Sequence, residues 1–230
     1  TIASVQAIDL NLGCPQDRAR DGLFGSFLLD KHHWSLVFEC VKACSETLKP
    51  FRLPFFCKIR LIEGNDTVAD TVQFCRGLIA NGASVICIHG RTRGSTKKRR
   101  CGPADLAAVA AIARTLHHEL QAEACQPYSI HNASSYADDT TSSSSPSIWG
   151  DDNSVHIHQH PNKYIKVPII SNGNINTTDD CRKALSITYP YCCGVMSAEG
   201  ILANPALFYG LTSKTLLSEA DVTSSSSSSS

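Results

Sequence analysis

The chain has 230 residues, of which 42% are hydrophobic and 18% charged, enough for one substantial core. Its 21 lysines and arginines balance 21 aspartates and glutamates, so the net charge gives no overall attraction to nucleic acid or to an acidic membrane. No apolar run approaches the roughly 18 residues that a membrane span needs. Composition therefore predicts a soluble globular protein without a membrane partner, in which binding of a polyanion depends on a local patch.

The eleven cysteines are scattered along a chain much longer than a disulfide-stapled mini-domain. Three of them, Cys57, Cys75 and Cys87, lie inside apolar runs. This usage predicts reduced thiols and a protein of the cytoplasm or the nucleus. No pair of cysteines has the CxxC spacing, which argues against a zinc ribbon.

Five short apolar runs rich in β-forming residues occur along the chain, and helical patterns separate them. The predicted strands cover 5–12, 54–61, 84–89, 167–171 and 193–197. The predicted helices cover 35–48, 68–80, 104–120 and 178–187. Strands that alternate with helices predict a parallel sheet with both faces covered. The GxGxxG fingerprint of a dinucleotide-binding Rossmann fold is missing after the first strand.

Polar side chains follow each predicted strand where it ends. They are Asn11 and Cys14, Lys58 and Arg60, His89 and Arg91, Asn172 and Asn174, and Ser197 and Glu199. Parallel strands that all end in polar groups are typical of the active face of a (β/α)8 barrel. The predicted fold class is therefore α/β, a TIM barrel.

The alternation fails over residues 123–166, which contain DDTTSSSSPS and HIHQH and show no hydrophobic period. We predict a long disordered insertion here. His156, His158 and His160 would face one way in an extended segment, but without a cysteine or carboxylate at ligand spacing we predict no metal site. The predicted parts are a first barrel part over 1–122, the insertion over 123–166, a second barrel part over 167–217 and a serine-rich tail over 218–230.

Seven motifs occur in an order that points to a known family. They are DLNLGCPQ, GLFGSFLLD, CKIRL, IHGRTR, GPADL, PIISNGNI and GVMSAEGILANPALF. Together they closely resemble the successive motifs of the tRNA-dihydrouridine synthases, which are FMN-dependent (β/α)8 enzymes. The MSAEG form at the last strand is similar to the eukaryotic branch that modifies the D-loop. The resemblance spans 8–208 apart from the insertion, and it implies reduction of uridine to 5,6-dihydrouridine in tRNA with NADPH as the reductant.

Cys14 stands on a predicted strand-to-helix turn between Gly13 and Pro15. Reducing the C5=C6 bond of uracil takes a hydride from reduced flavin at C6 and a proton at C5 from a general acid on the opposite face. A thiol is still protonated at neutral pH and can donate that proton. The family's catalytic cysteine falls on Cys14; the alternative is an inert loop cysteine.

The resemblance also places contacts with FMN. A lysine inside an apolar strand is costly unless it meets an anion, and Lys58 matches the family's lysine beside the flavin ring. His89 coincides with the family's FMN-contacting histidine. The alternative for Lys58 is a lysine that reaches solvent, and the alternative for His89 is a core histidine with its hydrogen bonds satisfied. The family has two FMN-binding turns. The first matches Asn172, Gly173 and Asn174, and the second matches Ala198 and Glu199. We expect Glu199 to contribute its backbone, because its carboxylate would repel a phosphate.

Substrate contacts are expected from the same rim. Asn11 can hydrogen-bond the edge of a flipped uracil. Arg91, Arg93 and the basic run 97–100 lie where tRNA phosphates should approach, although a charge run is also common on an ordinary solvated surface.

Five strands cannot close an eight-stranded barrel. The resemblance begins at the family's fourth strand, so we expect a truncated chain that lacks the first three strands and most of the C-terminal helical domain. Alone, it is expected to bind FMN weakly or not at all and to be inactive. Two other functions stay open: another FMN barrel oxidoreductase that acts on a small molecule, and an inactive RNA-binding fragment.

Charge reversal across residues 97–100 should weaken tRNA binding and leave the flavin content unchanged. For each phosphate that the variant no longer binds, the slope of log K against log salt falls by about 0.7 to 0.9. A salt titration of tRNA binding measures this slope, and an unaltered slope would return the run to the solvated-surface interpretation.

Overall fold

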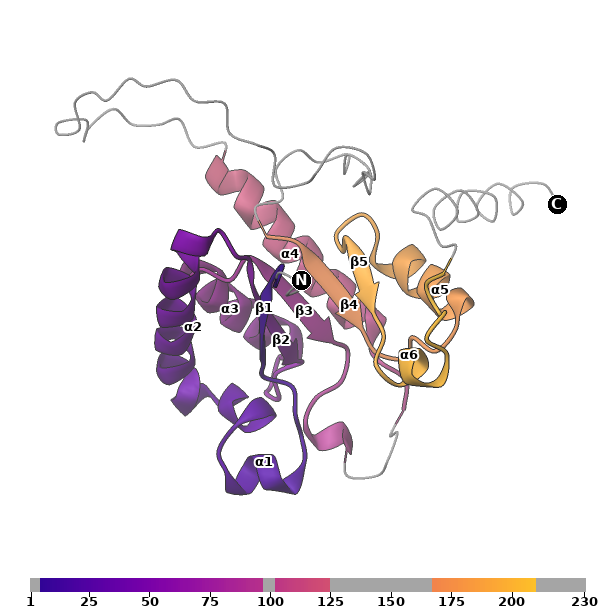
Figure 1. The fold of residues 1–230 in the computed structure, drawn as a ribbon, viewed down its shortest axis with the longest axis horizontal. Coiled ribbons are helices and arrows are strands. Elements are labelled where there is room, and N and C mark those ends of the chain that lie inside the picture. The colour runs from indigo at the N-terminus through magenta and orange to yellow at the C-terminus, as the bar shows by residue number, and fades with distance from the viewer. Residues whose placement is uncertain (1–4, 97–101, 125–166, 210–230) are drawn as a thin grey trace.

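The computed structural model describes residues 5–96, 102–124 and 167–209, and a five-stranded sheet forms its centre (Figure 1). The strands are β1 (Ile8–Asn11), β2 (Phe55–Arg60), β3 (Val85–His89), β4 (Ile169–Asn172) and β5 (Gly194–Met196). They pair in chain order, and every pairing is parallel. Each strand overlaps its predicted run, so the predicted parallel α/β sheet is confirmed.

Helices follow the strands. They are α1 (Asp17–Asp21), α2 (Trp34–Leu48), α3 (Thr67–Ala80), α4 (Leu106–Ala124), α5 (Thr178–Thr188) and α6 (Glu199–Ala203), with 3-10 turns at Gly25–Leu29, Lys31–His33, Lys49–Phe51 and Gly94–Thr96. Sequence periodicity predicts only the four long helices, because five residues are too few to show a helical period. Capping sets two of the starts: Asp66 accepts the N–H of Ala69 before α3, and Thr177 and Asp180 form a capping box at α5.

The register of the sheet decides which side chains share a face. Lys58 lies beside Asn11, and Arg60 lies beside His89, which in turn lies beside Asn172. Paired residues of neighbouring parallel strands point to the same face. These five polar side chains therefore form two adjacent rows at the carboxyl ends of the strands.

The hydrophobic core lies on the opposite face. The helices α2, α3, α4 and α5 form a layer there, each in contact with the next (Figure 1). Cys57 and Ile59 of β2 alternate with the polar residues and are buried in this core. Trp34, Phe38 and Phe74 join α2 to α3 through ring contacts with centroids 5.1 to 6.3 Å apart. This helix layer covers one face of the sheet, and the polar rows lie on the other face, where Arg60 and Asn172 are also buried.

Several predictions fall wholly or partly outside the described residues. Helix α4 occupies the first two residues of the predicted insertion, and 125–166 are not described. The run 97–100 and the tail 218–230 are not described either. Within the described residues the sheet is an open strip, so an incomplete (β/α)8 barrel stays a prediction. None of the described helices has the length and apolar character needed to cross a membrane.

Gly77→Ala on α3 should destabilise the fold, because a Cβ at this position would overlap the Phe38 ring of α2. Alanine gains about 1 kcal/mol of helix propensity over glycine. Overpacking costs about 1 to 3 kcal/mol, so we expect a net loss of up to about 2 kcal/mol. Urea unfolding measures this loss, with the exposed Gln73→Ala on the same helix as the control. A higher unfolding midpoint for Gly77→Ala would contradict the close packing of α2 on α3.

Candidate active site at the carboxyl edge of the sheet

The turn after β1 is tied to the sheet through its backbone. Leu12 donates its N–H to the carbonyl of Lys58 at 2.7 Å. Asn11 Oδ1 accepts the N–H of Gly13 at 2.9 Å, and Arg60 Nε donates to the carbonyl of Gly13 at 2.7 Å. The residue that follows, Cys14, is therefore carried by a turn whose position is fixed by β1 and β2.

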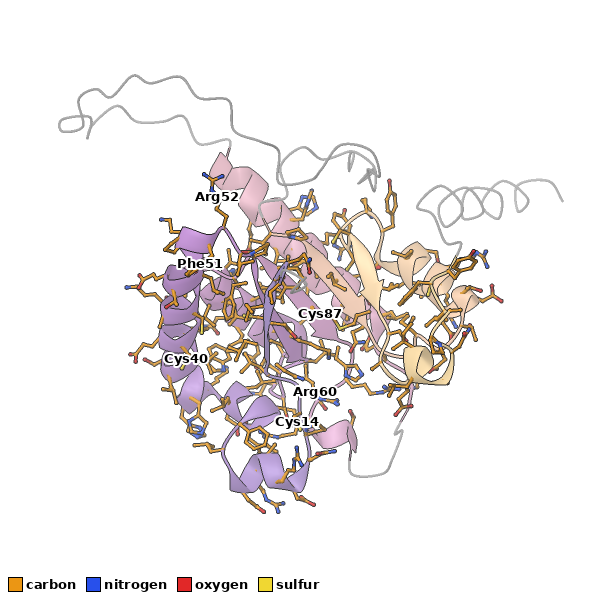
Figure 2. All side chains as sticks on the ribbon, in the orientation of Figure 1. Cys14, Cys40, Phe51, Arg52, Arg60 and Cys87 are labelled. Carbon is orange, nitrogen blue, oxygen red and sulfur yellow. The ribbon has the colours of Figure 1, made fainter. Side chains whose placement is uncertain are left out.

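Cys14 itself is partly buried, and it lies at the same end of the sheet as Arg60 (Figure 2). Its carbonyl accepts two hydrogen bonds from Ser26, one from the backbone N–H at 3.0 Å and one from Oγ at 2.9 Å. Gly25 has a φ of +61°. A Cβ there would lie 2.8 Å from Cys14 Cβ, so only glycine allows this loop to approach so closely.

Positive groups gather next to this turn. Lys58 and Arg60 end β2, and Arg91 follows His89 at the end of β3. Burial lowers the pKa of Lys58, and the nearby Arg60 lowers it further. Burial and then the charges of Arg60, Lys58 and Arg91 lower the pKa of His89 to about 3, so the imidazole is neutral at pH 7.

The tautomer of His89 follows from its neighbour. Arg91 Nη1 lies 3.2 Å from His89 Nε2, and a guanidinium can only donate. Nε2 of His89 therefore accepts, and the ring proton is on Nδ1. The two polar rows contain no carboxylate. Asp9 lies two residues before Asn11 on the same face of β1, where burial raises its pKa and the charge of Lys58 lowers it in part. An edge with this excess of positive charge suits an anionic or electron-rich ligand.

The turn after β4 takes backbone conformations that favour glycine and asparagine. The φ angles are +121° at Gly173 and +58° at Asn174. A Cβ on Gly173 would lie 2.6 Å from Ala104 Cβ and 3.0 Å from the ring of His89. Asn174 Oδ1 accepts from Arg91 Nη2 at 2.9 Å and from the N–H of Ala104. This turn therefore packs directly against the cationic edge.

The turn after β5 is joined to that of β4. Asn172 Nδ2 donates to the last carbonyl of β5 at 2.7 Å, and Ser197 Oγ donates to the carbonyl of Ile175 at 2.7 Å. Ala198 and Glu199 are exposed and begin α6. The two predicted FMN turns are thus adjacent in space.

Arg93 differs from the other predicted site residues. Its guanidinium forms a two-point ion pair with Asp30, at 2.9 and 3.0 Å. The structure thus places Asn11, Cys14 and the β2 to β5 residues along one edge, whereas Arg93 faces the loop that contains Asp30.

Sequence reasoning left two contributors outside the predicted site. The sequence predicts Arg60 at the end of a strand but gives it no role in the site. Its position two residues after Lys58 places both side chains on one face and could have indicated that role. Ser26 lies in the motif GLFGSFLLD, whose contact with Cys14 is a long-range one that no local pattern shows.

The cysteines and histidines of the described residues hold no metal-like cluster of three or more ligands. All nine described cysteines are free. The three alternating histidines 156, 158 and 160 lie outside the described residues.

His89 should make the fold sensitive to acid. Because its folded pKa is about 3 against 6.5 for the free side chain, the unfolded chain binds the extra proton. The contribution of the neutral His89 to the free energy of unfolding is fully present above pH 6.5. It is lost as the pH falls toward 3, at up to about 1.4 kcal/mol per pH unit. Urea unfolding from pH 7 to 4 should show a shallower decline for His89→Gln than for the exposed control His118→Gln. Equal declines would place the acid sensitivity elsewhere.

Comparison with known proteins identifies the family of the chain. A sequence model of the dihydrouridine synthase family (Dus) matches residues 2–122 and 155–226, most of the chain. A rat protein named as a tRNA-dihydrouridine(16/17) synthase-like protein of the NAD(P)(+) type is 31% identical over 204 residues, which cover 89% of this chain and 33% of the relative.

Two yeast relatives show the same partial coverage. A Saccharomyces cerevisiae tRNA-dihydrouridine(20a/20b) synthase is 30% identical over 89% of this chain and 40% of its own length. A Schizosaccharomyces pombe tRNA-dihydrouridine(16/17) synthase is 26% identical over 88% of this chain and 36% of its own length. The chain spans about a third of the length of these relatives. From the match over most of its residues, the chain belongs to the dihydrouridine synthase family.

Proposed function

We propose that this chain is the part of a flavin-dependent tRNA-dihydrouridine synthase that binds FMN and donates the proton in the reduction of a D-loop uridine. NADPH is the proposed reductant, and the cytoplasm or the nucleus the proposed compartment. The relatives named above support tRNA as the substrate. The observation that carries the proposal is the placement of Cys14 and the cationic edge side by side, joined by Arg60.

The residues at this edge fit FMN. Lys58, Arg60 and Arg91 supply positive charge, which the carboxylate of Asp9 offsets only in part, at Lys58. Gly173 packs so closely on Ala104 and His89 that a Cβ would clash, which holds the backbone of the turn after β4 against this edge. When bound, reduced FMN would supply the hydride for C6 of uracil. Lys58 and the neutral His89 are assigned to the flavin, and the backbone of the turns at Asn172, Gly173, Asn174, Ala198 and Glu199 to its phosphate.

Cys14 is assigned as the proton donor to C5 of uracil. Its turn is anchored at Gly13 by Arg60 and at its own carbonyl by Ser26, so the thiol is presented from a fixed backbone. A general acid must be within hydrogen-bond reach of the atom it protonates. A fixed backbone limits the loss of entropy when the base and the thiol are aligned.

Asn11 and Arg91 are assigned to the tRNA. Because Asn11 Oδ1 accepts the N–H of Gly13, its side-chain NH2 is the group assigned to a uracil carbonyl. Arg91 donates to the carbonyl of Gly102 and to Asn174, which are neutral partners, so its charge still attracts a phosphate. Arg93 is left out of this assignment, because its guanidinium is paired with the carboxylate of Asp30.

Cys14→Ala in the full-length protein should keep FMN bound and reducible by NADPH, yet abolish most dihydrouridine formation. Loss of a general acid typically lowers the rate by about 10² to 10⁴. Flavin absorbance and a dihydrouridine assay on tRNA measure the two effects. Cys40→Ala is the matched control, since Cys40 is exposed on α2, away from the edge (Figure 2).

Three outcomes separate the alternatives. Wild-type turnover by the Cys14→Ala protein would sink the assignment of the proton donor. Wild-type protein that binds FMN but makes no dihydrouridine in tRNA would favour a flavin enzyme that acts on a small molecule. Wild-type protein that binds tRNA without flavin would favour the inactive RNA-binding fragment.

A further inference from the structure

Arg93 is held by a loop that also holds Cys14. Its Nη1 donates to Asp30 Oδ2 at 3.0 Å and to the carbonyl of Ser26 at 3.1 Å. Its Nη2 donates to Asp30 Oδ1 at 2.9 Å. One guanidinium is therefore hydrogen-bonded to both ends of the segment 26–30.

The surroundings of Arg93 neutralise its charge. A second carboxylate, Glu63, has an oxygen 3.6 Å from Nη2, and the ring of Phe27 lies under the guanidinium with its centroid 4.7 Å from Cζ. Hydrogen bonding to Asp30 raises the pKa of Arg93. The side chain is only 23% exposed. A phosphate at this point would meet two carboxylates and compete with a two-point ion pair, so Arg93 is a poor phosphate ligand.

The segment 26–30 is also hydrogen-bonded to the backbone of Cys14. Ser26 accepts from Arg93 through its carbonyl and donates to the Cys14 carbonyl through both its N–H and its Oγ. Gly25 brings the segment within contact distance of Cys14 Cβ. A continuous chain of hydrogen bonds thus runs from Arg93 through Ser26 to Cys14.

We propose that Arg93 is a positioning residue that fixes the backbone of Cys14 through the segment 25–30, and that it does not bind tRNA phosphate. The planar guanidinium is needed, because only a fork of N–H donors can satisfy the Asp30 carboxylate and the Ser26 carbonyl together. The expected effect on dihydrouridine formation rests on the proposed function. The expected effect on the accessibility of the Cys14 thiol does not.

The first measurement is the rate at which iodoacetamide alkylates Cys14 in the full-length protein, read by mass spectrometry with Cys40 as the internal reference. Arg93→Lys, Arg93→Gln and Asp30→Asn should each raise the ratio of the two rates at least threefold, and Arg93→Gln combined with Asp30→Asn should add nothing beyond the single changes. Arg76→Gln is the matched control, because Arg76 forms a comparable two-point pair with Glu119 between α3 and α4, away from Cys14. Its ratio should stay at the wild-type value. An unchanged ratio in all the Arg93 and Asp30 variants would overturn the proposal.

The second measurement uses tRNA. A misplacement of about 1 Å can cost about 100-fold in rate, so kcat for dihydrouridine formation should fall by about 10- to 100-fold in Arg93→Lys, with KM within about twofold of wild type. The salt slope of tRNA binding should be unchanged. A slope reduced by about 0.7 to 0.9 with a wild-type alkylation ratio would make Arg93 a phosphate ligand and overturn the proposal. If wild-type protein makes no dihydrouridine, the proposed function fails, while the alkylation ratio still decides the role of Arg93.

Discussion

The buried hydrogen bond from Arg60 Nε to the carbonyl of Gly13, 2.7 Å long, connects the turn of Cys14 to the carboxyl end of β2. The same guanidinium donates to the carbonyl of Thr92 at 3.3 Å, so it also reaches the loop after β3. Arg60 is 7% exposed, and a buried guanidinium is tolerated only when its N–H groups have acceptors. The backbone carbonyls of two neighbouring loops meet this need, so the charge of Arg60 and the position of both loops depend on one another.

The partners of each arginine decide what its charge does. Arg60 and Arg91 donate to carbonyl and amide oxygens, which leave the net positive charge in place. Arg93 donates to the carboxylate of Asp30, which cancels its charge. The edge near Lys58 is therefore electropositive, and this field, together with burial, keeps His89 neutral. A ligand would meet a cationic edge on one side and, on the other, the hydrogen-bonded loop next to Cys14, whose Arg93 is paired with a carboxylate.

Hydrophobic periodicity was enough to predict the sheet and the long helices. The runs around β2 and β3 are buried on both sides and bounded by turn residues, and α3 and α5 carry local caps at the predicted starts. Periodicity missed α1 and α6, which are single turns whose conformation depends on contacts. In α6, for example, the N–H of Ile201 donates a hydrogen bond to Ser197 Oγ at the start of the helix. The predicted strands already placed Lys58, His89 and Asn172 near strand ends, and the register then put them in two rows.

By itself, the sequence determined the order and type of the main elements, because burial of alternating apolar residues is a local pattern repeated along each segment. It also determined that polar groups follow every strand and hence gather at one edge. Only the tertiary structure decided which of these groups share a partner: that Arg60 reaches Gly13, that Ser26 grips Cys14, and that Arg93 pairs with Asp30. These contacts join residues 12 to 63 positions apart, and their hydrogen bonds depend on distances that no spacing along the chain specifies.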